Sequence, residues 1–275
     1  MLGAGIVIVG LALAAILAAA RVARRYREPL LGYAPRIFRQ VHRIPVVGPV
    51  LAGARVVVPT RYVALHMILG LVATAAILAF VVIAEEVVAG REIAAFDLAF
   101  ADALRHNTSP RWQQVFRIIT AFGSTGLLLA LSTAVAGALL LGRHRVLAVG
   151  WMIGQAGGAL LNVMLKNAVA RTRPEFADAF LSTPSWSFPS GHAMSTFVFC
   201  GLGAYILVRF TRSWTTFAAV VAVAFAWCLV MGFTRLYLGV HFVSDVVAGL
   251  IAATAWVAVC VSGIEVALRR NKSNA

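Results

Sequence analysis

Charged residues are scarce in this chain: they make up 12% of its 275 residues, while 61% belong to the hydrophobic set. Soluble domains are about half apolar and about a quarter charged, so a soluble fold would have too little polar surface to cover this much aliphatic side chain. The same numbers exclude an intrinsically disordered chain, because such chains are poor in apolar residues and rich in charge. The composition indicates an integral membrane protein.

Acidic residues and cysteines are also few. There are 10 Asp and Glu against 24 Lys and Arg, a formal net charge of +14. In a membrane protein such an excess gathers in cytoplasmic loops beside anionic lipid headgroups, so we expect no nucleic-acid partner. The three cysteines, Cys200, Cys228 and Cys260, lie inside apolar runs without a Cys-x-x-Cys pair. This pattern predicts buried apolar side chains rather than zinc ligands or disulfides.

Apolar runs long enough to cross a bilayer core, which takes roughly 20 helical residues, occur seven times. They cover residues 2–20, 64–88, 118–141, 146–166, 192–208, 214–234 and 243–264. The first run could be a cleaved secretory signal, since small residues stand at its end. Its basic residues follow the run instead of preceding it, which favours a retained N-terminal transmembrane helix. The sequence therefore predicts an all-α integral membrane protein.

The basic residues also predict the orientation. The loops 141–146 and 209–213 and the tail 265–275 carry Arg and Lys with almost no acid, so the positive-inside rule places them and the C-terminus in the cytoplasm. Residues 22–63, rich in Arg and Pro, are predicted as a basic cytoplasmic connection that is partly interfacial. Residues 91–117 are predicted to be external and polar, with a surface helix over 94–105. The outer side would then hold the acids Glu85, Glu86, Glu92, Asp97, Asp102, Glu175 and Asp178.

Three polar clusters stand at helix ends that the alternation of spans places on the outer face. They are Lys166 to Arg173-Pro174, then Pro189-Ser190-Gly191-His192, then Thr234-Arg235 to His241 and Asp245. Ionisable groups are costly at membrane depth, so clusters of them indicate a function.

The first property of these clusters is that they could bind an anion. Lys166, Arg173 and Arg235 supply three cations, and the planar Arg fork suits phosphate oxygens. Ser190 and Gly191 precede a helix start, where backbone N–H groups and the positive helix end attract anions. The residues therefore predict an anion cradle that fits a phosphoryl group.

The second property is a nucleophile. His241 and Asp245 are four residues apart and share a helix face, and a carboxylate on one imidazole nitrogen leaves the other free to attack phosphorus. His192 can protonate the leaving oxygen and then activate water. We expect a bell-shaped pH profile, since His241 must be neutral while His192 is protonated. A plainer alternative is that Arg235 and Asp245 form a buried ion pair.

The clusters resemble the signature of the type 2 phosphatidic acid phosphatase (PAP2) family, which shares its phosphate site with vanadium haloperoxidases. The one departure is Thr234, where the family commonly has Ser. The resemblance covers residues 64–264 and implies a six-transmembrane-helix core. It says nothing about residues 1–63, where the apolar run predicts an extra helix over residues 1–21. It implies that His241 is the phosphohistidine nucleophile, with Asp245 as its partner and His192 as the acid. The implied phosphate contacts are Lys166, Arg173, Ser190, Gly191 and Arg235. Arg171 lies outside the signature and is expected to add to the positive field or to face headgroups.

The resemblance further implies a lipid phosphatase that needs no metal and no cofactor. The nearby acids, Glu175, Asp178 and Asp245, are too few and too dispersed for a two-metal site. The implied substrates are phosphatidate, phosphatidylglycerol phosphate or a polyprenyl diphosphate, with a slight preference for the last, at the outer face of a bacterial plasma membrane. Two alternatives stay open: a phosphotransferase on the same scaffold, and a non-catalytic anion-binding membrane protein.

Overall fold

The computed structural model describes residues 60–174, 185–211 and 213–273. The chain divides into two compact units, Met1–Ile68 and Leu69–Ala275. The predicted N-terminal helix over residues 2–20 and the basic connection as far as residue 59 lie outside the described residues. All described residues except 60–68, the start of the first core helix, belong to the second unit.

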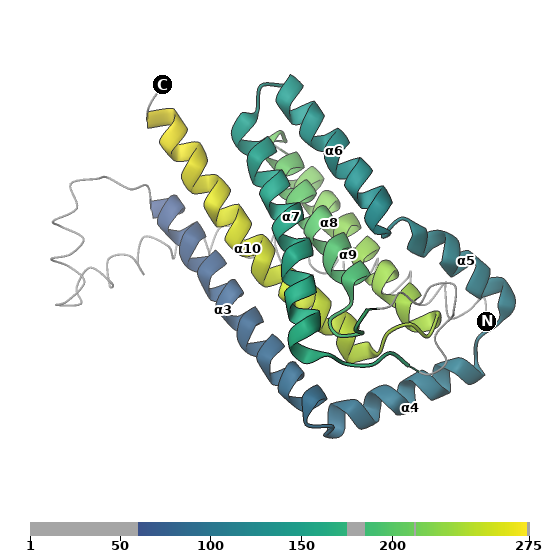
Figure 1. The fold of residues 1–275 in the computed structure, drawn as a ribbon. Helices are drawn as coiled ribbons and strands as arrows, with labels where there is room; N and C mark the ends of the chain where they lie inside the picture. Colours follow the sequence, from purple (N-terminus) through teal and green to yellow (C-terminus); the bar gives the residue numbers. More distant parts are fainter. Residues whose placement is uncertain (1–59, 175–184, 212, 274–275) are drawn as a thin grey trace, which may run out of the picture. The chain divides into compact units, whose positions relative to one another are not determined.

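All regular structure in the described part of the chain is α-helical (Figure 1). The helices are α3 (Thr60–Val88), α4 (Glu92–His106), α5 (Pro110–Ala121), α6 (Thr125–Leu141), α7 (Arg145–Val169), α8 (Gly191–Arg209), α9 (Trp214–Tyr237) and α10 (Val243–Ser273). Six stretches among these residues are long and apolar enough to cross a membrane, with α5 and α6 forming one of them. The predicted fold class, an all-α membrane protein with six core spans, is confirmed.

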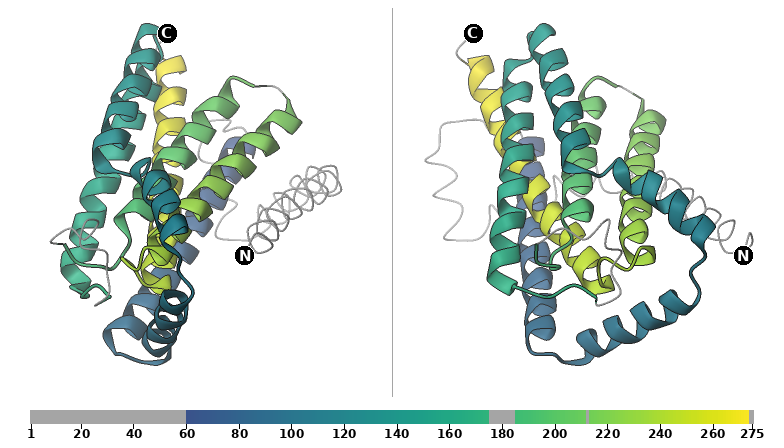
Figure 2. Two further views of the ribbon diagram at one scale, coloured as in Figure 1. Left: turned by 90° about the vertical axis from the view of Figure 1, so that its right-hand side faces the viewer. Right: turned by 45° about the vertical axis from the view of Figure 1, so that its right-hand side comes forward.

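The core of the unit is built around α8, which packs against α7, α9 and α10 (Figure 2). Trp151 of α7, Leu202 of α8 and Ala253 of α10 are at most 1% exposed and belong to one apolar cluster. Glycine allows the close approach, since a Cβ added to Gly154 would collide with Leu202 Cδ1. Outward-facing side chains such as Leu141, 88% exposed, are apolar, as a lipid environment requires.

The third predicted span differs from the prediction of one helix over 118–141. Here α5 begins earlier, with Pro110 at its first position, and it ends at Ala121 before α6 starts at Thr125. Gly123 lies in the turn between them, and a Cβ there would lie 2.8 Å from Met231 Sδ and 3.1 Å from His192 Cδ2. The helix is interrupted where the turn approaches α8 and α9 closely.

The region between the first two core spans forms α4, which crosses the lower end of Figure 1 at a steep angle to α3. A helix was expected over residues 94–105, and the structure confirms it with slightly wider bounds. The expectation of a surface-exposed helix is right for Asp102, whose side chain is 66% exposed. It is wrong for Asp97, which is fully buried because α4 contacts the start of α10 through that side chain.

Candidate active site

The three polar clusters lie at one end of the bundle, where α7 and α9 finish and α8 and α10 begin. The backbone joins two of the clusters, since the Ser190 amide donates to the Asp245 carbonyl over 2.9 Å. Arg173 Nη1 lies 3.5 Å from His241 Nε2 and joins the first cluster to the third. The structure thus brings the predicted site residues together, although the segments that carry them are far apart in the chain.

His241 and Asp245 form a hydrogen-bonded pair at the start of α10. His241 Nδ1 lies 3.2 Å from Asp245 Oδ2, and the Phe242 amide donates to the same oxygen over 2.9 Å. The two side chains are 3% and 0% exposed. The turn that delivers His241 passes through Gly239, whose φ of +66° favours glycine. A carboxylate on Nδ1 places the proton there and leaves the Nε2 lone pair free.

Burial lowers the pKa of His241 to about 4, although the hydrogen bond and the charge of Asp245 act in the opposite direction. The imidazole is therefore neutral at neutral pH, which is the state that a nucleophile requires. Burial also lowers the pKa of Arg173, and the Asp245 carboxylate partly offsets this effect. Arginine remains charged even so, because its ordinary pKa lies far above neutrality.

Arg173 lies next to the free nitrogen of His241, and the charge of Arg235 also acts on this imidazole. Arg173 is held by bonds from Nε to the Ser185 carbonyl over 3.0 Å and from Nη1 to the Val240 carbonyl over 2.9 Å. Lys166, in the last turn of α7, donates to the Trp186 carbonyl. The charges of Lys166, Arg173 and Arg235 act on one another, so the three lie within electrostatic range.

Arg235, in the last turn of α9, is only 3% exposed, and its Nη1 donates to Thr120 Oγ1 over 2.9 Å. The alternative ion pair between Arg235 and Asp245 does not form among the described residues, because Arg171 pairs with Asp245 instead. Thr234, the departure from the family pattern, donates its hydroxyl to the Met231 carbonyl within α9. That bond is one that either Ser or Thr can make.

Two buried donors at this place lack a hydrogen-bond partner among the described residues: Ser190 Oγ and Arg235 Nε. Buried polar groups in proteins are normally paired, so these atoms are available to a ligand. The start of α8 also has little room for a side chain, since a Cβ on Gly191 would lie 3.1 Å from Asn162 Oδ1. Together these features make a cradle whose open donors suit the oxygens of an anion.

His192 lies in the first turn of α8, one residue beyond Gly191. Its ring interacts electrostatically with His241 and with the three cations, so it lies close to the same cradle. The α5–α6 turn forms the adjacent wall, because Gly123 approaches the His192 ring. A proton carried by His192 would therefore lie close to an anion that is bound in the cradle.

Asp97 was missed as a candidate in the sequence, and Arg171 was placed outside the signature. Arg171 lies over the Phe242 ring and contacts both Asp97 and Asp245, so the expectation that it faces lipid headgroups is wrong. A signal for Asp97 was present, since it lies four residues from Ile93 and from Ala101, on the face of α4 that contains buried Ala101. A carboxylate in the middle of such a face needs a partner.

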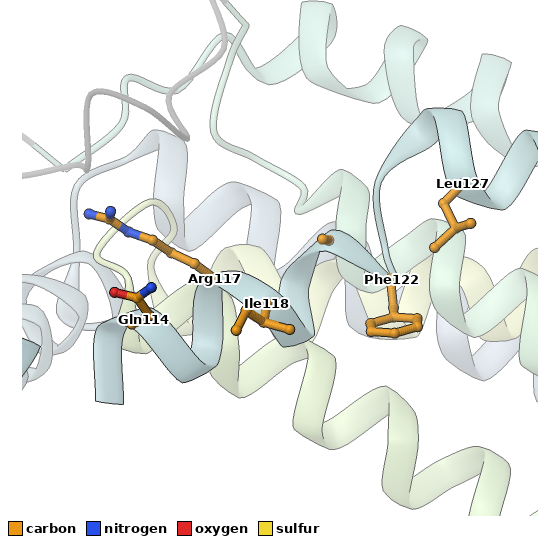
Figure 3. A pocket seen from close by; sticks show the side chains of 6 residues that line it. Gln114, Arg117, Ile118, Phe122 and Leu127 are labelled. Atoms are coloured by element: carbon orange, nitrogen blue, oxygen red, sulfur yellow. The ribbon is translucent and has the colours of Figure 1, made fainter. Parts of the chain in front are cut away.

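An open pocket of about 480 Å³ lies on the α5–α6 turn, lined by Gln114, Arg117, Ile118, Ala121, Phe122 and Leu127 (Figure 3). It contains none of the residues of the three polar clusters. The convergence of cations and histidines, rather than the size of this pocket, therefore marks the candidate active site. Among the residues that the structure describes, no group of three or more His, Cys, Asp or Glu side chains could hold a metal ion.

Residues 145–268 match the model of the PAP2 superfamily. Phosphatidylglycerophosphatase B of Bacillus subtilis (strain 168) is 32% identical over 143 residues, which cover 51% of this chain and 69% of that protein. The chain belongs to the PAP2 superfamily. A lipid A 1-phosphatase of Rhizobium etli is 30% identical over 162 residues, covering 50% of this PAP2 chain and 65% of that protein.

A solved structure agrees with this membership. The transmembrane PAP2 type phosphatidylglycerolphosphate phosphatase from Bacillus subtilis superposes with a TM-score of 0.63 at 28% identity, over 70% of this chain and 96% of that one. The PAP2 family match spans α7 to α10 and includes the three polar clusters. It does not include α4, and so it says nothing about Asp97.

Proposed function

We propose that this PAP2 protein is a membrane lipid phosphatase that hydrolyses a phosphate or diphosphate monoester through a phosphohistidine. The observation that carries the proposal is the arrangement of His241. Its Nδ1 is held by Asp245, and its Nε2 lies 3.5 Å from the guanidinium of Arg173. A neutral imidazole held in this way is a nucleophile that faces a place where cations gather.

The reaction would proceed in two steps. In the first, His241 Nε2 forms a bond to phosphorus while the bond from phosphorus to the lipid oxygen breaks, and His192 gives that oxygen its proton. In the second, His192 accepts a proton from water, the water oxygen attacks phosphorus, and the N–P bond breaks to release phosphate. Asp245 stabilises the positive charge on the imidazole ring in the intermediate.

The cradle would stabilise the charge of the phosphoryl group during both steps. Arg173 and Lys166 supply two of its positive charges, and Arg235 contributes its buried Nε, which has no other partner among the described residues. Ser190 Oγ and the first turn of α8 supply further donors. Donors already oriented toward the transferred group need little reorganisation when the transition state forms.

The relatives support a phosphorylated lipid as the substrate class. One is named for phosphatidylglycerophosphate and another for lipid A, and the candidate site lies at the end of membrane-spanning helices, where a lipid headgroup would be. The basic residues Arg143, Arg145, Arg209, Arg269 and Arg270 lie at the other end of their helices. The positive-inside rule then supports an outward-facing site and a cytoplasmic C-terminus.

The test is phosphate release by detergent-purified full-length protein in EDTA. Phosphatidylglycerol phosphate, phosphatidate and undecaprenyl diphosphate are supplied in parallel without any acceptor. His241→Ala should abolish release, while the matched control His144→Ala, at the opposite end of α7, should retain it. Radiolabelled substrate should leave an acid-labile, alkali-stable label on the wild-type protein.

Each contrary result would contradict a different statement of the proposal. Release by His241→Ala would exclude the phosphohistidine. Loss of release in EDTA would show a metal requirement. Absence of release from every lipid by folded protein would reject the hydrolase and favour transfer to an acceptor or simple anion binding.

A further inference from the structure

The two oxygens of the Asp245 carboxylate have different partners. Its Oδ2 faces His241 Nδ1 and also accepts from the Phe242 amide and the Ser187 hydroxyl. Its Oδ1 accepts from Arg171 Nη1 over 2.8 Å. Arg171 therefore holds the oxygen that His241 does not use, and so fixes the rotation of the carboxylate.

Arg171 is itself held by Asp97. Its Nη2 donates to Asp97 Oδ2 over 2.9 Å, and its guanidinium lies 4.2 Å from the centre of the Phe242 ring. The planar fork suits this position, since it can reach two carboxylates with two different nitrogens. Arg171 also donates to Ser244 Oγ over 2.8 Å, which ties it to the first turn of α10.

Asp97 joins a distant helix to the nucleophile. It is fully buried on α4, and it accepts from the Ser244 amide over 3.0 Å and from the Ser244 hydroxyl. The contact spans 147 residues of sequence. Asp97 thus satisfies an amide that the first turn of α10 would leave unpaired, next to the residue that orients His241.

The charges of this group also favour a role in chemistry. Asp97 and Asp245 are both fully buried, and Arg171 is 13% exposed, so two carboxylates face one guanidinium. A buried carboxylate is costly unless it is paired and hydrogen-bonded. Asp245, which shares this guanidinium with Asp97, also contacts His241, whose ring becomes positive when it is phosphorylated.

We propose that Asp97 and Arg171 are positioning residues for the nucleophile, acting through the Asp245 carboxylate. The inference rests on the proposed phosphatase function. It adds α4, which lies outside the PAP2 family match, to the machinery of the site. A plainer role, in which Asp97 only caps α10 and stabilises the fold, is the alternative that the experiment must separate.

The experiment compares Asp97→Asn and Arg171→Lys with wild type on phosphatidylglycerol phosphate in detergent micelles. Asp102→Asn is the matched control, because it changes an exposed carboxylate on the same helix. Removing an outer partner that orients a functional group costs about 10- to 100-fold in comparable metal sites. We expect a fall in kcat of that size for both variants and a change in KM of less than about threefold, since the phosphate cradle is intact.

A second measurement reports on His241 without turnover. Selective ¹⁵N-histidine labelling, with His241→Ala to assign the signal, should show Nδ1 protonated in wild type at neutral pH. Asp97→Asn and Arg171→Lys should mix in the other tautomer. If wild type hydrolyses none of the lipids, the proposed function fails, and the tautomer still decides whether these residues orient the ring.

A double variant separates positioning from stability. Because Asp97 acts through Asp245, Asp97→Asn added to Asp245→Asn should lower kcat by less than about twofold. The proposal would be overturned if the losses of kcat in the two single variants multiplied in the double variant while the tautomer stayed unchanged. Wild-type kcat in folded Asp97→Asn and Arg171→Lys would also overturn it. If Asp97→Asn does not fold, Arg171→Lys decides the question by the same criteria.

Discussion

Gly249 gives the sharpest test of how α10 positions the start of α8. A Cβ added there would lie 2.8 Å from the Ser190 carbonyl oxygen, 3.4 Å from Ala193 Cβ and 3.5 Å from the Met194 amide nitrogen. The nearest atom belongs to the backbone, so no side-chain rotation can relieve the contact. In Gly249→Ala, therefore, the two helices must move apart.

The size of the effect follows from two opposing terms. Overpacking a well-packed interior costs about 1–3 kcal/mol, while Ala in place of a helical Gly returns about 1 kcal/mol. Gly137→Ala on α6 supplies the second term alone, because no atom lies within 4 Å of its added Cβ. The difference in stability between the two variants should then be about 1–3 kcal/mol, which lowers the melting temperature by several degrees.

Activity should fall as well, because Ser190 belongs to the cradle and its amide bonds the Asp245 carbonyl. A misplacement of about 1 Å can cost on the order of 100-fold, so a shift of a few tenths of an ångström should lower kcat/KM about 3- to 10-fold. Thermal melting in detergent and phosphate release measure the two effects. If Gly249→Ala melts no lower than Gly137→Ala and retains wild-type kcat/KM, the reasoning about this close approach is wrong.

Three further predictions concern the site. Arg173→Lys keeps the charge but loses the fork, so kcat/KM should fall about 10- to 100-fold; wild-type turnover would contradict bidentate binding. Because burial lowers the pKa of His241 to about 4, kcat/KM should lose nothing to this group between pH 7 and about 5 and fall about tenfold per pH unit below about 4; an acid limb near 6.5 would refute this. Thr120→Val removes the acceptor of Arg235 Nη1 and should lower kcat/KM about 10-fold or more. Thr133→Val, at an exposed site on α6, should leave kcat/KM unchanged. Equal effects of the two substitutions would contradict a role for the bond between Arg235 and Thr120.

The spacing of residues along the chain was sufficient to predict the contact between His241 and Asp245. His241 and Asp245 are neighbours in sequence, and their contact depends only on a helix that begins between them. Membrane alternation was sufficient to place the three clusters at one end, since each cluster marks the end of a span. Both inferences use local rules, and local rules do not depend on how the helices pack.

Packing decided what the sequence could not show. Arg171 contacts Asp97 across 74 residues, and this depends on where α4 meets α10. The interruption at Gly123 could not be seen in the sequence, because hydropathy averages over the whole apolar run. The helix breaks where the turn comes close to Met231 and His192. The missed features are therefore contacts between segments rather than properties of any one of them.

The end of α7 has a consequence for insertions and deletions. Ala170 adopts a left-handed conformation with φ 51°, and the chain then runs back past the site, with the Arg171 carbonyl accepting from the Ser187 amide over 2.8 Å. Arg171 thereby reaches the far oxygen of Asp245, while Arg173 reaches the far nitrogen of His241. One short segment therefore contacts both members of the pair formed by His241 and Asp245. Deletion of Thr172, between the two arginines, would break both contacts, whereas substitution of either arginine would break one.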